Sequence, residues 1–205
     1  MQIDHLVYAV PDLELAMDEL ESRLGIRPVF GGQHLSKGTK NALLNLGNGA
    51  YLELLAIDKT NLEAPLPRWM GIDLVHSSTM VRWALKTDQI EVVSSILSAH
   101  RSDLGKVETG ERQKANGDFL RWQMSLPAAS PMVDIIPFYV DWSKSSSHPC
   151  QDLTEACSIR DIQLSHPTPN ELNQLFNELE LDLQIRSGQP EIRVAIESPK
   201  GVQWL

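Results

Sequence analysis

The chain has 205 residues, of which 42% are hydrophobic and 22% are charged. These proportions are typical of a soluble globular protein, and the length allows one substantial domain or two small halves that pack together. The formal net charge of −9, without any run of Lys or Arg, excludes an electrostatic basis for binding nucleic acid or an anionic membrane.

Residues 1–57 are predicted to form one strand, one helix and three further strands. Apolar residues alternate in IDHLVYAV (3–10), which is typical of a half-buried strand. From Leu13 to Leu24 they recur at helical spacing, and Asp12 is suited to cap the start of this helix. Alternation then returns, and it predicts strands at residues 27–35, 39–48 and 50–57.

The same order of elements recurs twice along the chain, more weakly each time. A Pro-rich connector at 58–79 leads to a second unit at 80–142. A polar, Ser-rich linker at 143–157 leads to a third, shorter unit at 158–205. Strands and helices mixed in this way predict an α+β protein that forms one compact domain overall.

Within the second unit, the pattern predicts strands at 117–127 and 131–142. Asn116-Gly117 is a hairpin signal before the first of them.

Strand alternation sorts the side chains of the predicted sheet into two faces. The more apolar set, which includes Trp122 and Met124, should pack against the helices. The other set is polar but only weakly charged, and His5 should share its side of the sheet with Glu53. Its further members are Asn41, Asn45, Arg121 and Gln123. Such a face could hold a small ligand or could be the solvated side of a half-buried sheet, and the pattern leaves both open.

Three stretches of the sequence resemble the glyoxalase-like branch of the vicinal oxygen chelate superfamily. They are DHLVYAVPDL (4–13), GGxHxxxGTxNALLxLGxGxYLEL (31–54) and the later IIPFYVDW…HP (135–149). In this superfamily, paired βαβββ modules form a curved, cup-shaped mixed sheet with helices on its outer face. The resemblance implies that the first two units are such modules, and we expect the third unit to extend their sheet.

Metal-dependent members of the superfamily bind a divalent ion at the base of the cup through the first and last strands of each module. The resemblance therefore implies His5 and Glu53 as ligands for Zn, Ni, Mn or Fe, which imidazole and carboxylate groups suit. In the second module, Val81, Arg82 and Trp83 lie where a His or Gln ligand is expected, and Asp134 lies about where Glu53 has its counterpart. Three protein ligands would form a catalytic type of site, whereas two would bind a metal weakly.

The resemblance implies a small-molecule enzyme, a metal-dependent lyase, isomerase or dioxygenase, in which Glu53 or Asp134 moves a proton. The alternative is a protein that binds a small polar or anionic compound without a metal and without chemistry. The candidate substrate-binding residues are His34, Asn41, Asn45, Arg121 and Gln123. In the binding protein without chemistry, the hydrogen bonds to the compound would come from His5, Asn41, Asn45, Glu53, Arg121 and Gln123. As a third possibility, the linker at 141–157 could itself fill the cup.

The sequence also bears on location and assembly. No segment approaches the roughly 20 apolar residues of a membrane-spanning helix, and the start MQIDHLV lacks the features of a secretory signal. Cys150 and Cys157 form no CxxC pair, and two thiols favour a reducing compartment. We expect a cytoplasmic protein that binds a small molecule but no nucleic acid and no membrane. The resemblance is compatible with a homodimer, because dimers are common in this fold.

Overall fold

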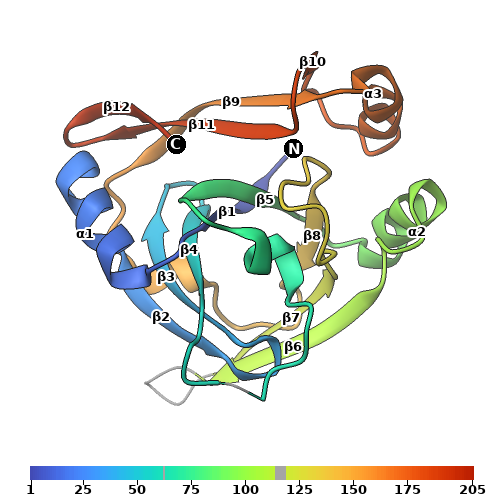
Figure 1. Ribbon diagram of the computed structural model, residues 1–205. Coiled ribbons are helices and arrows are strands. Elements are labelled where there is room, and N and C mark those ends of the chain that lie inside the picture. Colours follow the sequence, from blue (N-terminus) through green and yellow to red (C-terminus); the bar gives the residue numbers. More distant parts are fainter. Residues whose placement is uncertain (62, 114–118) are drawn as a thin grey trace.

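The computed structural model describes residues 1–61, 63–113 and 119–205, and within them it contains an eight-stranded sheet, a separate four-stranded sheet and three α-helices (Figure 1). The hairpin predicted at Asn116-Gly117 lies outside these residues. No helix in the described ranges is long and apolar enough to cross a membrane.

The predicted order of one strand, one helix and three strands is confirmed for the first module. Its elements are β1 (Ile3–Ala9), α1 (Leu13–Leu24), β2 (Val29–His34), β3 (Thr39–Asn45) and β4 (Tyr51–Ile57). The Asp12 carboxylate accepts a hydrogen bond from the amide of Leu15 and so caps α1, which ends at Gly25 in the left-handed conformation.

The second module repeats this order with a shorter last strand. Its elements are β5 (Thr79–Lys86), α2 (Ile90–His100), β6 (Val107–Gln113), β7 (Phe119–Ser125) and β8 (Phe138–Asp141). The strand predicted at 131–142 therefore begins only at Phe138. Pro131 and Pro137 bound the segment before it, and proline has no N–H to donate to a neighbouring strand.

The two modules form one curled sheet with the strand order β2-β3-β4-β1-β5-β8-β7-β6. At its centre β1 and β5 run antiparallel, whereas β1 pairs with β4 and β5 pairs with β8 in parallel. The two modules thus repeat one pattern on either side of the β1–β5 pair. Figure 1 shows α1 and α2 outside the curl, and the expected cup-shaped sheet with outer helices is confirmed.

The third unit does not extend this sheet, and that expectation is wrong. It consists of β9 (Ser158–His166), α3 (Pro169–Glu178), β10 (Ile185–Ser187), β11 (Glu191–Ser198) and β12 (Gly201–Trp204), and its strands form a separate sheet. This second sheet lies across the convex side of the first, between α1 and α2 (Figure 1). The buried Trp83 of β5 packs there against Phe176 of α3, with ring centroids 6.2 Å apart.

The third unit covers an apolar strip of the first sheet that lies between α1 and α2. On the convex side of β1 and β5, the large side chains of Leu6, Trp83 and Leu85 are buried in one cluster with Val194 and Ile196 of β11. Exposing this strip to water would cost about 25 cal/mol for each Å² of apolar surface. The second sheet therefore closes the back of the cup and leaves its concave side open.

Candidate functional site

A cavity of about 480 Å³ lies on the concave side of the eight-stranded sheet. This volume is in the range of small-molecule sites. Both modules contribute to its walls, and so does the connector between them through Trp69. The aromatic part of the lining consists of Tyr51, Trp69, Trp122, Phe138 and Trp142. The polar part includes His5, His34, Asn41 and Glu53.

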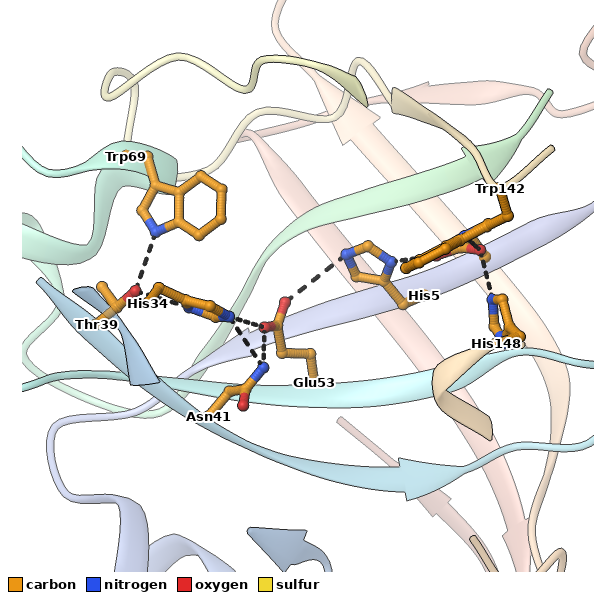
Figure 2. A network of polar contacts seen from close by, with 9 residues as sticks. His5, His34, Thr39, Asn41, Glu53, Trp69, Trp142 and His148 are labelled. Atoms are coloured by element: carbon orange, nitrogen blue, oxygen red, sulfur yellow. Dashed lines mark hydrogen bonds and ion pairs between the residues drawn. The ribbon is translucent and has the colours of Figure 1, made fainter. Parts of the chain in front are cut away.

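His5 and Glu53 lie side by side on the floor of this cavity. Parallel pairing sets Val7 of β1 opposite Glu53 of β4, so His5, two residues earlier on the same face, is diagonal to Glu53. The side chains point toward each other (Figure 2), with His5 Nε2 and Glu53 Oε2 3.7 Å apart. This separation is too long for a hydrogen bond. Both residues are about 95% buried, so these atoms face the cavity and not bulk water.

Asp4 fixes the orientation of His5 from behind. A register shift in β1 between Ile3 and His5 interrupts the alternation and leaves Asp4 completely buried. Its carboxylate accepts hydrogen bonds from His5 Nδ1 at 2.6 Å, from Trp142 Nε1 at 2.7 Å and from His148 Nε2 at 2.9 Å. With Nδ1 bonded to Asp4, the Nε2 atom of His5 is the one presented to the cavity.

The contacts of Asp4 keep it ionised. Burial acts to raise the pKa of Asp4, but the hydrogen bonds from His148 and His5 outweigh it and hold the pKa well below its usual value. The sequence does not predict a role for Asp4, because strict alternation assigns it to the face opposite His5. Two of its three partners also come from the distant linker region, and no local pattern signals that.

On the other side of Glu53, Asn41 and His34 complete the polar network (Figure 2). Asn41 Nδ2 donates to Glu53 Oε1 at 2.6 Å. His34 Nε2 lies 3.9 Å from the same oxygen, and its Nδ1 lies 3.0 Å from the hydroxyl of Thr39. One Glu53 oxygen is therefore held by Asn41, while the other faces His5.

Three of the predicted substrate-binding residues lie outside the cavity lining. Asn45 donates instead to the carbonyl groups of Cys150 and Leu153. Arg121 and Gln123 point away from the cavity, and the prediction that they line the cup is wrong. Arg121 lies 3.5 Å from Glu111, and Gln123 accepts a hydrogen bond from Lys144.

The error in β7 has a simple cause. The alternation predicts that the more apolar face of this strand packs against a helix. In the structure the enclosed space is the cup itself, so Trp122 and Met124 face the cavity and the Arg121 side chain is 55% exposed on the outside.

Asp134 is not brought together with His5 and Glu53. It forms an ion pair of 2.6 Å with Arg101, just beyond the end of α2, and accepts a hydrogen bond from the amide of Ile136. It also lines a small separate cavity beside Arg82. Asp134 is therefore not proposed as a member of the site of His5 and Glu53.

Backbone hydrogen bonds identify the residues that do correspond to His5 and Glu53 in the second module. At the end of β1, Val10 N donates to Leu55 O, and at the end of β5, Thr87 N donates to Val140 O. These bonds make Thr87 the equivalent of Val10 and Val140 the equivalent of Leu55. His5 comes five residues before Val10, and the residue five before Thr87 is Arg82. Glu53 comes two residues before Leu55, and the residue two before Val140 is Phe138. The expectation that Asp134 is the counterpart of Glu53 is thus wrong.

These counterparts decide whether the residues fit the metal that the superfamily implies. Phe138 has no donor atom, and Arg82 is a cation whose guanidinium donates to the carbonyl groups of Val81, Ala128, Pro131 and Met132. In the described part of the chain, no group of three or more His, Cys, Asp or Glu side chains is arranged to hold a metal ion. His34 Nε2 lies 3.9 Å from Glu53 Oε1, but His5, His34 and Glu53 are not arranged as such a group. Two protein ligands fall short of the three of a catalytic metal site, so the residues do not fit a site of this kind.

Comparison with known proteins supports the assignment of the fold. The family model described as "Glyoxalase-like domain" matches residues 3–180. Among curated proteins, none matches the chain. A hypothetical protein from Staphylococcus aureus has a similar solved structure, with a TM-score of 0.63 and 16% identity, over 99% of this chain and 83% of that chain. The match therefore includes the third unit.

Two further solved structures are similar over part of the chain. Methylmalonyl-CoA epimerase from Mycobacterium tuberculosis matches with a TM-score of 0.44 and 19% identity, over 68% of this chain and 87% of that chain. A hypothetical protein from Bacillus halodurans matches with a TM-score of 0.42 and 18% identity, over 68% of this chain and 93% of that chain.

Proposed function

Since the chain belongs to the glyoxalase-like domain family of the vicinal oxygen chelate superfamily, we propose that it acts on a small molecule in the cup, as an isomerase or lyase in which Glu53 and His5 transfer protons. One observation carries this proposal. Two proton-carrying side chains face each other across 3.7 Å at the floor of the cavity, and a buried carboxylate, Asp4, orients one of them.

In the proposed reaction, Glu53 Oε2 accepts a proton from a substrate carbon next to a carbonyl group. His5 donates the proton on its Nε2 atom to the carbonyl oxygen, which gives an enol, and Asp4 stabilises the ring from the other side, as carboxylates do in acid–base pairs with histidine. In the second half of an isomerisation, Glu53 gives its proton to a carbon of the enol and His5 Nε2 takes a proton back from an oxygen. Both side chains thus regain their starting protonation states, and no further reactant is required.

Glu53→Gln is expected to slow such proton transfer by about a hundredfold or more, because glutamine has the shape of glutamate but cannot take the proton. The protein would be incubated in D₂O with small carbonyl compounds that have an exchangeable C–H group. Loss of their ¹H NMR signals then reports exchange. Asp134→Asn is the matched control and should leave the exchange rate unchanged. Loss of exchange in Asp134→Asn, with an unchanged exchange rate in Glu53→Gln, would refute the assignment of Glu53 as the proton acceptor.

The same reaction is proposed to run without a metal, because the donor set does not fit one. Adding Zn²⁺, Mn²⁺, Ni²⁺ or Fe²⁺ to protein treated with a chelator should leave the melting temperature and the exchange rate unchanged. A rise in both with one of these ions, abolished by His5→Ala, would instead support the metal-dependent lyase or dioxygenase that the superfamily implies.

A second candidate function is ligand binding without chemistry. The observation that favours it is the 2.6 Å hydrogen bond from Asn41 to Glu53, which holds the carboxylate as a fixed acceptor for a ligand. If wild type and Glu53→Gln both bind a ligand and neither catalyses exchange in D₂O, the result would favour a binding protein over an enzyme.

A further inference from the structure

The charged groups of the cavity indicate which ligands it can accept. Among the described residues, the lining includes the glutamates Glu53 and Glu108 and one Lys or Arg side chain, Lys37. Glu111 also borders the cavity, but its carboxylate lies 3.5 Å from Arg121 on the outside. Lys37 already has a partner, because its Nζ lies 2.8 Å from Glu108. Arg82 and Arg121, the cations that could favour an anionic compound, are both outside the lining. Glu53, by contrast, has no Lys or Arg partner among the described residues, so an anionic ligand on the floor of the cavity would meet its carboxylate.

The walls of the cavity suit a positive charge for a second reason. The indoles of Trp122 and Trp142 lie next to each other, with centroids 5.5 Å apart and planes tilted by 49°. Trp69 lines the cavity together with them. Aromatic faces attract cations, and several together form the cages that bind alkylated ammonium groups.

Gly110 of β6 makes this arrangement possible. It pairs with Trp122 across the strands, and a Cβ atom at residue 110 would overlap the indole ring. The absence of a side chain lets the ring lie against β6, so that Trp122 is part of the wall of the cavity.

The protein itself contains one example of the proposed contact. The ammonium group of Lys37 lies 5.5 Å from the centroid of the Trp69 ring while it is paired with Glu108. An indole face and a carboxylate therefore already bind one cation at the edge of this cavity.

We infer that the natural ligand of the cavity is a small organic cation, an amine or ammonium compound with an apolar or aromatic body and the carbonyl group that the proposed reaction needs. The cation lies against the indoles and is balanced by carboxylates of the lining. This inference names the substrate class of the proposed function and rests on it for the identity of the site.

Isothermal titration with matched probes tests the charge preference. Phenethylammonium, 2-phenylethanol and 3-phenylpropionate have similar bodies and differ mainly in charge. The cation should bind at least about tenfold more tightly than the alcohol and still more tightly than the anion, and added salt should weaken its binding. Equal or tighter binding of 3-phenylpropionate, or no binding of phenethylammonium at about 10 mM, would overturn the inference.

Two variants test whether the Trp122 indole contacts the charged group of the ligand. Trp122→Leu should weaken binding of phenethylammonium about five- to tenfold while changing that of 2-phenylethanol much less. Trp204→Leu, at an indole on β12 and outside the lining, is the matched control and should change neither. An equal loss for both probes in Trp122→Leu would contradict a contact with the charge.

This experiment and the exchange experiment can fail separately. Tight binding of the cation without any proton exchange would refute the proposed reaction and leave the ligand class standing. Exchange of anionic carbonyl compounds, lost in Glu53→Gln, would support the reaction and refute the ligand class.

Discussion

Asp4→Asn is expected to lower the free energy of unfolding by about 3–5 kcal/mol. Three N–H groups, from His5, Trp142 and His148, converge on the two oxygens of a completely buried carboxylate. Asparagine replaces one of these oxygens by an NH₂ group, so at least one donor would face another donor. Urea denaturation of wild type and variant measures the loss.

Asp12→Asn is the matched control for this substitution. Asp12 is exposed and caps α1, and asparagine caps helices about as well as aspartate. Its effect should stay within about 0.5 kcal/mol. A similarly small effect of Asp4→Asn would show that the buried carboxylate does not hold the His5 ring in place.

The contribution of Asp4 should also depend on pH. Because its pKa is depressed in the folded protein, the unfolded chain takes up this proton first when the pH falls. The stability that Asp4 contributes is therefore complete above about pH 5 and is lost progressively below about pH 4. The difference between wild type and Asp4→Asn should narrow over that range, and a constant difference would contradict the assignment.

Arg82→Met is the second substitution with a large expected effect, again about 3–5 kcal/mol. The Arg82 side chain is 1% exposed, and its guanidinium donates to four carbonyl oxygens at 2.7 to 3.0 Å. Three of these oxygens belong to the segment 128–132. Methionine fills similar space but leaves these oxygens buried without a donor.

Arg82 keeps its charge despite this burial. Burial lowers its pKa to about 10, which still leaves it protonated at neutral pH. Arg121→Met is the control, because the exposed ion pair of Arg121 with Glu111 should contribute less than about 1 kcal/mol. If both variants lose the same small amount in urea denaturation, Arg82 does not anchor the segment before β8.

The first module could be predicted almost completely from the sequence, because its signals are local. The alternation in residues 3–10, the apolar spacing in α1 and the cap at Asp12 all agree with one another. The pairing of His5 with Glu53 on one face then follows from the parallel register of β1 and β4. Asp4 could not be predicted, because a single register shift changes which way a side chain points.

The second and third units were harder to predict, because their environment is set by distant parts of the chain. Alternation in β7 separates Trp122 from Arg121 correctly but does not say which side is enclosed. The pattern of the third unit predicts strands and a helix, but not that Trp83 needs a cover on the convex side. Asp134 shows the same limit, since counting residues could not reveal that its segment leaves the sheet before β8.

In the second module, Arg82 and Phe138 take the places of His5 and Glu53. The two modules therefore contribute differently to the proposed site. The groups proposed to move protons, and the carboxylate that orients them, all lie in the first 53 residues of the chain. The second module supplies Trp122 and Phe138, which line the cavity but have no role in the proposed reaction. In the proposed site, the two modules thus differ: the first carries the proton-transfer groups and the second supplies aromatic walls. Selection for a new ligand could therefore act on the second half while the chemistry of the first is retained.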